Sequence, residues 1–137
     1  MLRIEHLAEK DIPQVVEIEN ISFSNPKSEE IFKSDQNKYL VAREKEKIIG
    51  YIGIEKIVGE SHIINMAVHP DARRKGSGQK LLEEILNDKD VFFLEVRVSN
   101  DAAIKLYEKY GFKKAGKRMN YYADNNEDAY LMRRNPK

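Results

Sequence analysis

The order of strand-like and helix-like segments is the feature that most constrains the fold of this chain. Three apolar runs, residues 38–44, 47–57 and 61–68, follow one another with only short turns between them, the charged "EKEK" and Gly59-Glu60. Such runs are typical of strands joined as hairpins. Two later segments each pass from a strand into a helix, which is typical of crossover connections. Together the patterns predict a mixed α/β domain with three layers.

The remaining apolar runs extend this sheet. Residues 2–7 alternate as a first strand, and residues 91–98, "VFFLEVRV", give the strongest strand signal in the chain. Residues 112–122 and 128–134 have the pattern of a last hairpin.

Four helices are expected between these strands, each with a recognisable start or stop. Side-chain caps and a proline in the first turn mark starts, and a glycine in the left-handed conformation marks a stop. The residues in these positions are Asp11 with Pro13, Ser28, Ser99 or Asn100, and Gly111, and the third helix is expected to run to about Asn87. The residues expected to face the core are Ile12, Val15, Val16, Ile18, Ile31, Phe32, Leu81, Leu82, Ile85 and Leu86.

Length and composition fit one domain spanning residues 1–137. The 24 Lys and Arg residues balance 23 Asp and Glu residues, so no global charge draws the chain toward nucleic acid or a membrane. The chain has no cysteine, and its three histidines lie far apart, which argues against a metal site. No segment has the pattern of a signal peptide or a membrane span, so we expect a cytoplasmic protein, either a monomer or a homodimer.

A glycine-rich turn opens the third expected helix, in the stretch "AVHPDARRKGSGQKLLEEIL" of residues 67–86. Free backbone N–H groups at the start of a helix, where the helix dipole is positive, favour an anion. Gly76 and Gly78 let a phosphate approach the backbone closely, and Arg73, Arg74 and Lys75 add positive charge. The alternative is a solvated basic turn whose glycines only help it bend, and loop chemistry alone leaves both open.

Two familiar phosphate loops do not fit this stretch. A P-loop needs a second glycine followed by Lys and then Ser or Thr, which "GSGQKLL" lacks. The dinucleotide fingerprint needs a third glycine, and Leu81 stands in that place. What remains is Arg-x-x-Gly-x-Gly, several residues after a strand and opening a helix.

This motif resembles the cofactor loop of the GNAT acetyltransferases. The stretch "FLEVRVSNDAAIKLYEKYGF" is similar to the following strand and helix of their bacterial ribosomal-protein alanine N-acetyltransferases, as are "NYY", "EDAYLM" and "SFSNPKSEEIF". The resemblance implies the GNAT fold, a central and mostly antiparallel mixed sheet flanked by helices on both faces. It also implies transfer of an acetyl group from acetyl-CoA to an amine, without a metal.

The resemblance assigns cofactor contacts to two neighbouring segments and one cap. The loop would carry the pyrophosphate through its backbone N–H groups, and the preceding strand end would bind the pantetheine arm as a peptide adds to a sheet edge. The implied residues are Met66, Ala67, Val68, Arg73, Arg74, Lys75, Gly76, Ser77, Gly78, Gln79 and Asn100.

Glu95 is the candidate general base. Alternation places Phe93, Glu95 and Arg97 on one face of a strand whose other residues are apolar. Partial desolvation there would make the carboxylate a better proton acceptor. The pattern alone favours a structural Glu95–Arg97 pair, whereas the resemblance matches Glu95 to the proton acceptor of the family.

Tyr107 is the candidate acid, because its phenol could donate to the sulfur of the departing CoA. The pattern of its helix favours ordinary core packing beside Ile104, and only the match to "LY" in the family gives it a catalytic role.

The acceptor side is the least specified part of the sequence. Tyr122 is the preferred substrate contact, and Asp124, Glu127 and Asp128 could attract a protonated peptide N-terminus, although each is compatible with ordinary hairpin surface. The family loop has a Trp after the Pro, but here Pro26 is followed by Lys27, which weakens the assignment of the peptide pocket.

Three functions stay open on the sequence. The resemblance implies acetylation of a protein N-terminal amine, namely the N-terminal Ala of a small-subunit ribosomal protein. The same fold could acetylate a small amine such as a polyamine, an amino sugar or an amino acid. The third possibility is a CoA-binding regulatory domain without turnover. The expected partner is an acceptor peptide, with no direct contact to nucleic acid or membrane.

Overall fold

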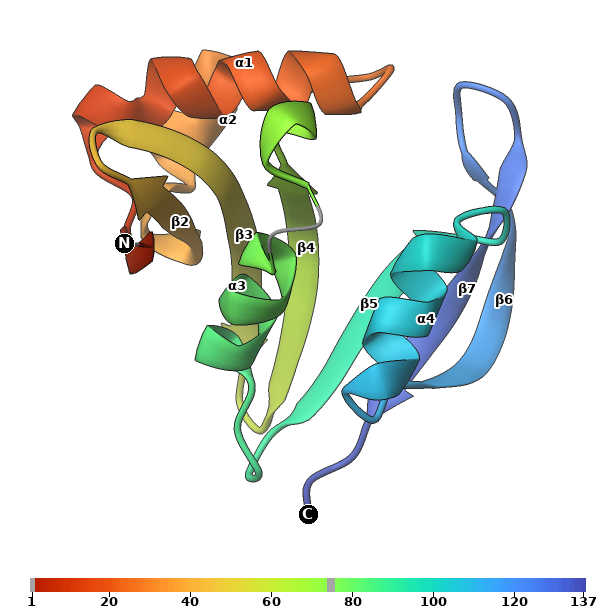
Figure 1. Cartoon of the computed structure of the whole chain (residues 1–137). Helices are drawn as coiled ribbons and strands as arrows, with labels where there is room; N and C mark the ends of the chain where they lie inside the picture. The colour runs from red at the N-terminus through yellow and green to blue at the C-terminus, as the bar shows by residue number, and fades with distance from the viewer. Residues whose placement is uncertain (1, 74–75) are drawn as a thin grey trace. The chain divides into compact units, whose positions relative to one another are not determined.

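Seven strands and four α-helices make up the chain in the computed structural model, which describes residues 2–73 and 76–137 (Figure 1). The strands are neighbours in the order β1-β2-β3-β4-β5-β7-β6. The strands are β1 Leu2–His6, β2 Tyr39–Glu44, β3 Lys47–Ile57, β4 Glu60–Val68, β5 Val91–Arg97, β6 Lys113–Tyr122 and β7 Glu127–Arg134. The α-helices are α1 Ile12–Ser22, α2 Glu29–Ser34, α3 Ser77–Ile85 and α4 Asp101–Lys109.

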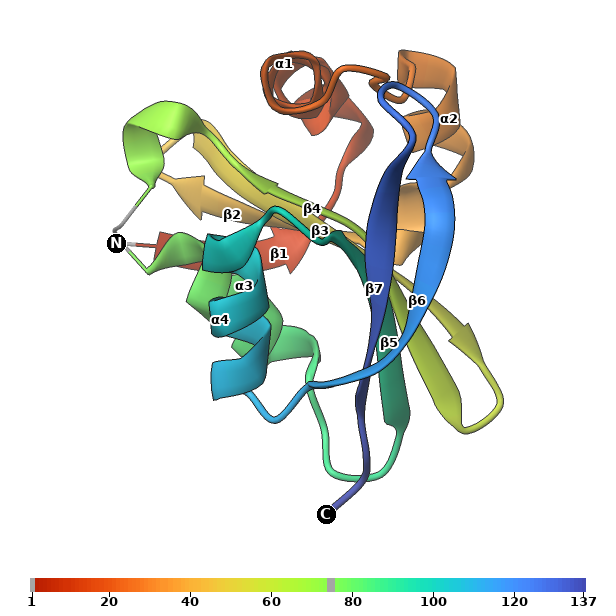
Figure 2. The same ribbon diagram turned by 90° about the vertical axis from the view of Figure 1, so that its right-hand side faces the viewer.

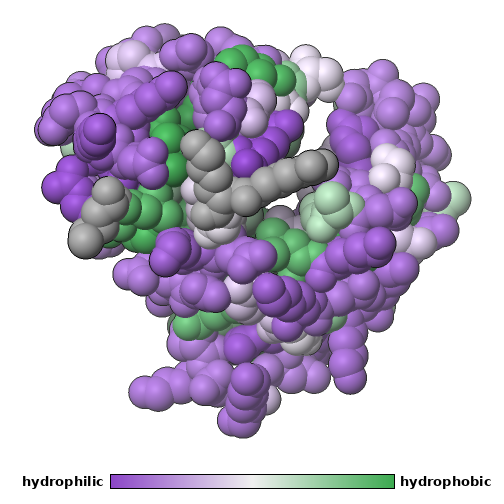
Figure 3. Space-filling view, viewed as in Figure 1, coloured by the Kyte–Doolittle hydropathy of each residue, from purple (hydrophilic) through white to green (hydrophobic). Residues whose placement is uncertain are grey.

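The fold contains two compact units. The first consists of Met1–Ile54 with Ile64–Leu86, and the second of Glu55–Ile63 with Asn87–Lys137. The face drawn in Figure 3 is mostly hydrophilic, with small apolar areas between charged side chains. None of the described helices has the length and apolar character needed to cross a membrane.

In the first unit, helices cover both faces of the sheet. β2 pairs antiparallel with β1 and β3, and α1 and α3 lie on opposite sides of these strands (Figure 2). On the side of α1 and α2, the rings of Phe32 and Tyr39 meet edge to face at 5.1 Å, and Phe32 meets Tyr51 at 5.9 Å. On the other side, Leu81 of α3 packs so closely that a Cβ on Gly50 would lie 3.3 Å from its Cδ1 atom. These contacts confirm the prediction of a mixed sheet flanked on both faces.

The starts of α1 and α2 follow different rules. The Ser28 hydroxyl accepts a hydrogen bond from the backbone N–H of Ile31 at 3.3 Å, as predicted for a cap. Asp11 stands at the cap position of α1 but makes no side-chain cap. Its carboxylate instead accepts a 2.6 Å hydrogen bond from Nη2 of Arg43 on β2. The predicted capping role of the Asp11 side chain is therefore wrong, because its carboxylate binds the buried Arg43 instead of the helix N-terminus.

In the second unit, β5 alternates as the sequence predicts. Its buried residues Phe92, Leu94 and Val96 point to one face, and the residues that alternate with them are half-buried on the other, namely Val91, Phe93, Glu95 and Arg97. β5 pairs in parallel with the first residues of β4 and antiparallel with β7, which pairs with β6. β6 is the edge strand, and it is exposed along nearly its whole length.

Some element boundaries, and the burial of one residue, differ slightly from the sequence prediction. The turn between β3 and β4 is Val58-Gly59, and Glu60 already belongs to β4. α3 ends at Ile85, so Leu86 follows the helix, and both residues are half-buried. Ile31 is 42% exposed, and only its neighbour Phe32 enters the core.

Candidate active site

The glycine loop ends at a backbone conformation that only glycine adopts readily. Gly76 has φ +80° and precedes α3, whose first hydrogen bond runs from the N–H of Lys80 to the Gly76 carbonyl at 3.0 Å. Among residues 2–73 and 76–137, and leaving the neighbour in the chain aside, no atom lies within 4 Å of the place a Gly76 Cβ would take. The first N–H groups of α3 have no partner within the helix, so this end of the first unit offers hydrogen-bond donors to an anion.

Gly78 makes a close contact possible rather than an unusual backbone conformation. A Cβ there would lie 3.1 Å from the Cε atom of Met66, so the absent side chain lets α3 approach the end of β4. Ser77 between the two glycines is 3% exposed. The start of α3 therefore packs against the end of β4, where Met66 to Val68 are the predicted cofactor contacts.

Arg73 connects the loop to β4. Its Nε donates a hydrogen bond to the Val68 carbonyl at 3.1 Å, so one acceptor of the strand end is already in use. Gln79 lies in the first turn of α3, and Met66 and Ala67 lie on β4 beside Val68. The predicted contacts Arg74 and Lys75 lie outside the described residues.

Glu95 lies on the half-buried face of β5 in the second unit. Its side chain is 20% exposed, and its Oε2 atom pairs with Nε of Arg118 on β6 at 3.2 Å. Arg97, on the same face, pairs with Asp124 and Glu127 instead. The structural Glu95–Arg97 pair that the pattern favoured is therefore wrong, and the partner of Glu95 comes from a strand that sequence analysis did not connect to it.

Tyr107 is buried in α4 with its ring edge-on to Phe112, at 5.7 Å between centroids. Burial raises the pKa of Tyr107 to about 12, and the nearby phenol of Tyr122 adds to the shift. Tyr107 is therefore protonated at neutral pH. Asn100 caps the same helix by accepting a hydrogen bond from the N–H of Ala103 at 3.2 Å, which confirms the predicted cap.

Tyr122 ends β6 and is half-buried. The guanidinium carbon of Arg97 lies 4.0 Å from the centre of its ring, and the Tyr121 ring meets it edge to face at 5.1 Å. Burial, together with the neighbouring Tyr121, raises the pKa of Tyr122 to about 12. Of the predicted site residues, Tyr122 lies in the second unit with Glu95, Asn100 and Tyr107.

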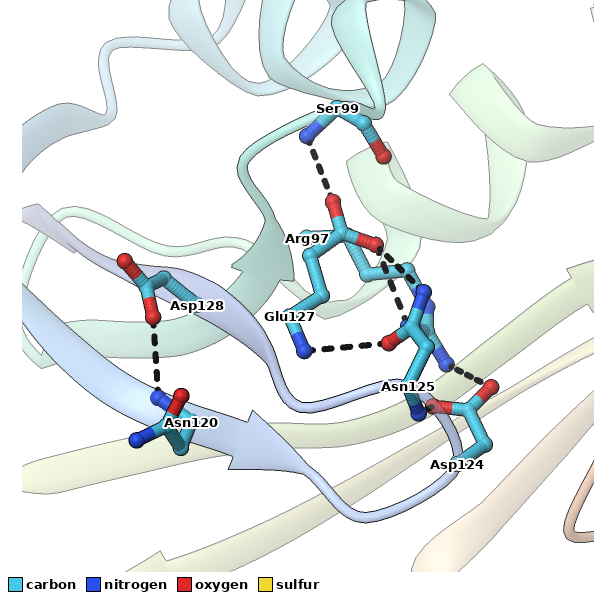
Figure 4. A network of polar contacts seen from close by, with 7 residues as sticks. All are labelled: Arg97, Ser99, Asn120, Asp124, Asn125, Glu127 and Asp128. Atoms are coloured by element: carbon cyan, nitrogen blue, oxygen red, sulfur yellow. Dashed lines mark hydrogen bonds and ion pairs between the residues drawn. The ribbon is translucent and has the colours of Figure 1, made fainter.

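The acidic residues of the β6–β7 turn are held by internal contacts (Figure 4). Asp124 and Glu127 bind Arg97 at 2.8 and 3.2 Å, and Glu127 also accepts the N–H of Ser99 at 2.9 Å. Asp128 accepts the N–H of Asn120 at 2.9 Å. These carboxylates fix the hairpin, a role that sequence analysis missed because the contacts join residues far apart in the chain.

Comparison with known proteins agrees with this geometry. The sequence model of the Acetyltransferase (GNAT) family matches residues 4–112. The chain belongs to the GNAT family of acetyltransferases.

Relatives within the GNAT family cover almost the whole chain. It is 36% identical to a putative ribosomal protein bS18-alanine N-acetyltransferase of Bacillus subtilis, over 94% of this chain and 92% of the relative. It is 37% identical to the ribosomal protein bS18-alanine N-acetyltransferase of Escherichia coli, over 96% of each chain. A crystal structure of the E. coli ribosomal-protein-S18-alanine N-acetyltransferase superposes with a TM-score of 0.89 at 35% identity, over 98% of this chain and 93% of that one.

The first unit suits the diphosphate of the GNAT cosubstrate, acetyl-CoA. An anion needs N–H donors and positive charge, and the start of α3 with Arg73 provides both. Among residues 2–73 and 76–137, no group of three or more His, Asp or Glu side chains is arranged to hold a metal ion.

Proposed function

We propose that this single-domain GNAT protein transfers the acetyl group of acetyl-CoA to the N-terminal alanine of a small-subunit ribosomal protein in the cytoplasm. One observation carries the proposal, namely identity of 36–37% over nearly the full length to two relatives named for acetylation of the alanine of bS18. The similar solved structure, of the E. coli enzyme, supports the same acceptor.

Acetyl-CoA is proposed to bind to the first unit through backbone groups. The N–H groups that open α3 after Gly76 would bind its diphosphate, with Arg73, Arg74 and Lys75 adding charge. Met66, Ala67 and Val68 would hydrogen-bond the pantetheine arm as a strand does. Asn100, which caps α4, is a further proposed contact.

The acceptor amine must be neutral when it attacks the thioester. An α-amino group has a pKa of about 7.7–8.0 and a lysine side chain about 10.4, so the N-terminus is the easier nucleophile near neutral pH. Glu95 is proposed to take the proton of the amine, directly or through water, as the new C–N bond forms and the C–S bond breaks. Its limited exposure and its position on the half-buried face of β5 support this role.

Tyr107 is proposed to assist the departing thiolate. With a pKa of about 12, its phenol stays protonated and can donate a hydrogen bond to sulfur. A thiol has a pKa of about 8.5, so complete proton transfer from this phenol would be unfavourable, and stabilisation of the negative charge is its better-supported contribution.

The test is an acetyl-transfer assay that measures release of free CoA thiol. The substrates are a peptide that begins with Ala, the same peptide with a blocked N-terminus, and a panel of polyamines, amino sugars and amino acids. The proposal expects turnover with the free peptide alone, with the acetyl group located on the α-amine by mass spectrometry. Turnover of a small amine instead would indicate the second function, and binding of acetyl-CoA without turnover of either class would indicate the third.

The role of Glu95 is tested with Glu95→Gln against a matched control, Arg118→Met. Both variants remove the Glu95–Arg118 ion pair, but only the first removes the carboxylate. We expect kcat to fall by about 100-fold or more in Glu95→Gln, as general-base removal does, and to change little in Arg118→Met. Equal effects in the two variants would show that the ion pair matters and that Glu95 is not the base.

The role of Tyr107 is tested with Tyr107→Phe. Because its raised pKa of about 12 keeps the phenol protonated, Tyr107 should add no ionisation to the pH–rate profile in the ordinary range. The profiles of wild type and variant should therefore run parallel between about pH 6 and 10, with the variant lower by about tenfold or more. A variant profile that lost an alkaline limb would contradict this account.

A further inference from the structure

The guanidinium of Arg97 makes several different contacts at the base of one turn (Figure 4). Nη2 donates to Oδ2 of Asp124 at 2.8 Å, and Nη1 donates to Oδ1 of Asn125 at 3.1 Å and to Oε1 of Glu127 at 3.2 Å. Its flat face covers the ring of Tyr122 at 4.0 Å. One side chain on β5 therefore holds both the last residue of β6 and the turn that follows it.

Further contacts close this arrangement. Asn125 Oδ1 also accepts the N–H of Glu127 at 3.0 Å, and Glu127 Oε2 accepts the N–H of Ser99, the residue two positions after Arg97. The turn is thus attached to β5 by Arg97 and to the segment before α4 by Glu127. Without the guanidinium, the carboxylates of Asp124 and Glu127 would lose the positive charge that both of them bind. The Tyr122 ring would lose the surface against which it rests.

Only arginine has the shape for all of these contacts. The planar guanidinium can use its edge for several carboxylate and amide oxygens and its face for an aromatic ring at the same time. A lysine would keep the charge but lose both the fork and the stacking surface. The geometry is therefore more specific than charge neutralisation requires.

We propose that Arg97 is a positioning residue for the acceptor peptide, because it fixes the Tyr122 ring and the β6–β7 turn in the conformation that receives the peptide. The proposal rests on the proposed function, in which Tyr122 is the acceptor contact. It assigns Arg97 no contact with the reacting atoms.

Arg134 provides a matched control in the same unit. It too lies over an aromatic ring, with its guanidinium carbon 5.9 Å from the centre of Phe92, and it donates to the carbonyls of Tyr110 and Asn87, each at 2.8 Å. It holds the loops before β5 and β6 rather than the β6–β7 turn. Arg134→Lys should therefore lower stability without a selective effect on the peptide.

Steady-state kinetics of Arg97→Lys, Arg134→Lys, Tyr122→Leu and the Arg97→Lys/Tyr122→Leu double variant test the proposal. We expect Arg97→Lys to raise KM for the Ala peptide by about tenfold, the factor that matches loss of one charged hydrogen bond, with kcat and KM for acetyl-CoA nearly unchanged. Because Arg97 acts through Tyr122, the double variant should be little worse than Tyr122→Leu. Additive effects, or an equal rise in Arg134→Lys, would overturn the proposal.

Amide hydrogen exchange tests the same proposal without any acceptor. Arg97→Lys should lose protection at Ser99 and Glu127, whose N–H groups donate to Glu127 and Asn125, the residues that Arg97 binds, while Arg134→Lys keeps it. Unchanged protection in Arg97→Lys would refute the positioning role even if the peptide activity were absent. If protection falls as expected in Arg97→Lys but the wild-type protein does not acetylate the peptide, the result would count against the proposed function alone.

Discussion

Arg43 in the first unit and Arg97 in the second each bind two carboxylates, yet their surroundings differ. Arg43 binds Asp11 at 2.6 Å and Glu5 at 3.3 Å, and the side chains of Arg43 and Asp11 are 7% and 3% exposed. The side chains of Arg97 and Asp124 are 29% and 28% exposed. The hydrogen bond with Asp11 is the main reason that the pKa of the Arg43 guanidinium is raised. A buried pair is intolerant of losing one partner, whereas a partly exposed pair is better suited to holding a surface turn in place.

The largest expected effect separates these two clusters directly. Asp11→Ala leaves the buried Arg43 without its closest partner and should cost about 3–5 kcal/mol of unfolding free energy. Asp124→Ala, the matched change in the second unit, should cost less than about 1 kcal/mol, because solvent screens its pair with Arg97. Urea unfolding of both variants measures the difference. Similar costs in the two variants would remove the distinction between the clusters.

A second buried group of the first unit should show an intermediate effect. Glu19 is 2% exposed and accepts hydrogen bonds from the Tyr51 hydroxyl at 2.6 Å, the Asn65 amide at 2.9 Å and the N–H of Lys27 at 2.9 Å. Glu19→Gln places an amide NH₂ group, which cannot accept a hydrogen bond, against one of these donors. It should lower the free energy of unfolding by about 1–3 kcal/mol. Thermal or urea unfolding checks it, with the exposed Glu17→Gln as control. A cost no larger than that of the control would mean that the network adds no stability.

Two glycines with the same backbone conformation give a smaller but sharper test. Gly59 has φ +76° and Gly76 has φ +80°, and in the part of the chain that the structure describes a Cβ at either would meet no atom within 4 Å beyond its chain neighbours. Gly59→Ala and Gly76→Ala should each cost about 1 kcal/mol of stability through backbone strain. Only Gly76→Ala should also weaken binding of acetyl-CoA, by about tenfold or more in calorimetry. Equal affinity in both variants would contradict the proposed diphosphate site.

The smallest expected effect is local and depends on pH. Hydrogen bonds, above all from Ser99, lower the pKa of Glu127 below its usual 4.5. A lowered pKa means that the contribution of Glu127 is complete above its unfolded-state pKa and is lost as the pH falls through the folded one. Exchange protection of the Ser99 N–H should therefore persist at neutral pH and decline only when the pH falls below the usual glutamate pKa of 4.5. Loss of protection nearer neutrality would mean that the turn is held in another way.

Local chemistry made part of the structure predictable. The caps Ser28 and Asn100 and the stop at Gly111, with φ +95°, depend on residues within one turn, and the sequence contains all of them. The alternation in β5 likewise placed Glu95 and Arg97 on one face before any tertiary contact was known.

The polar partners were not predictable from the sequence. Asp11 binds Arg43, which is 32 residues away in the sequence, and Arg97 binds Asp124, which is 27 residues away. Such pairings depend on strand register, and β6 changes its register against β7 between Arg118 and Tyr122. A one-residue slip would exchange the two faces of β6, so neither the partner of Glu95 nor the place of Tyr122 follows from spacing alone.

The edge strand β6 also bears on how the protein behaves at high concentration. Its outer row of backbone groups is an obvious template for pairing with another copy, but the strand carries Lys113, Lys114, Lys117 and Arg118 and no acidic residue. Two such strands brought side by side would repel each other. Positive charge on an edge strand is a common protection against edge-to-edge aggregation of sheets. Solubility should therefore fall if these cations are replaced by neutral β-branched residues.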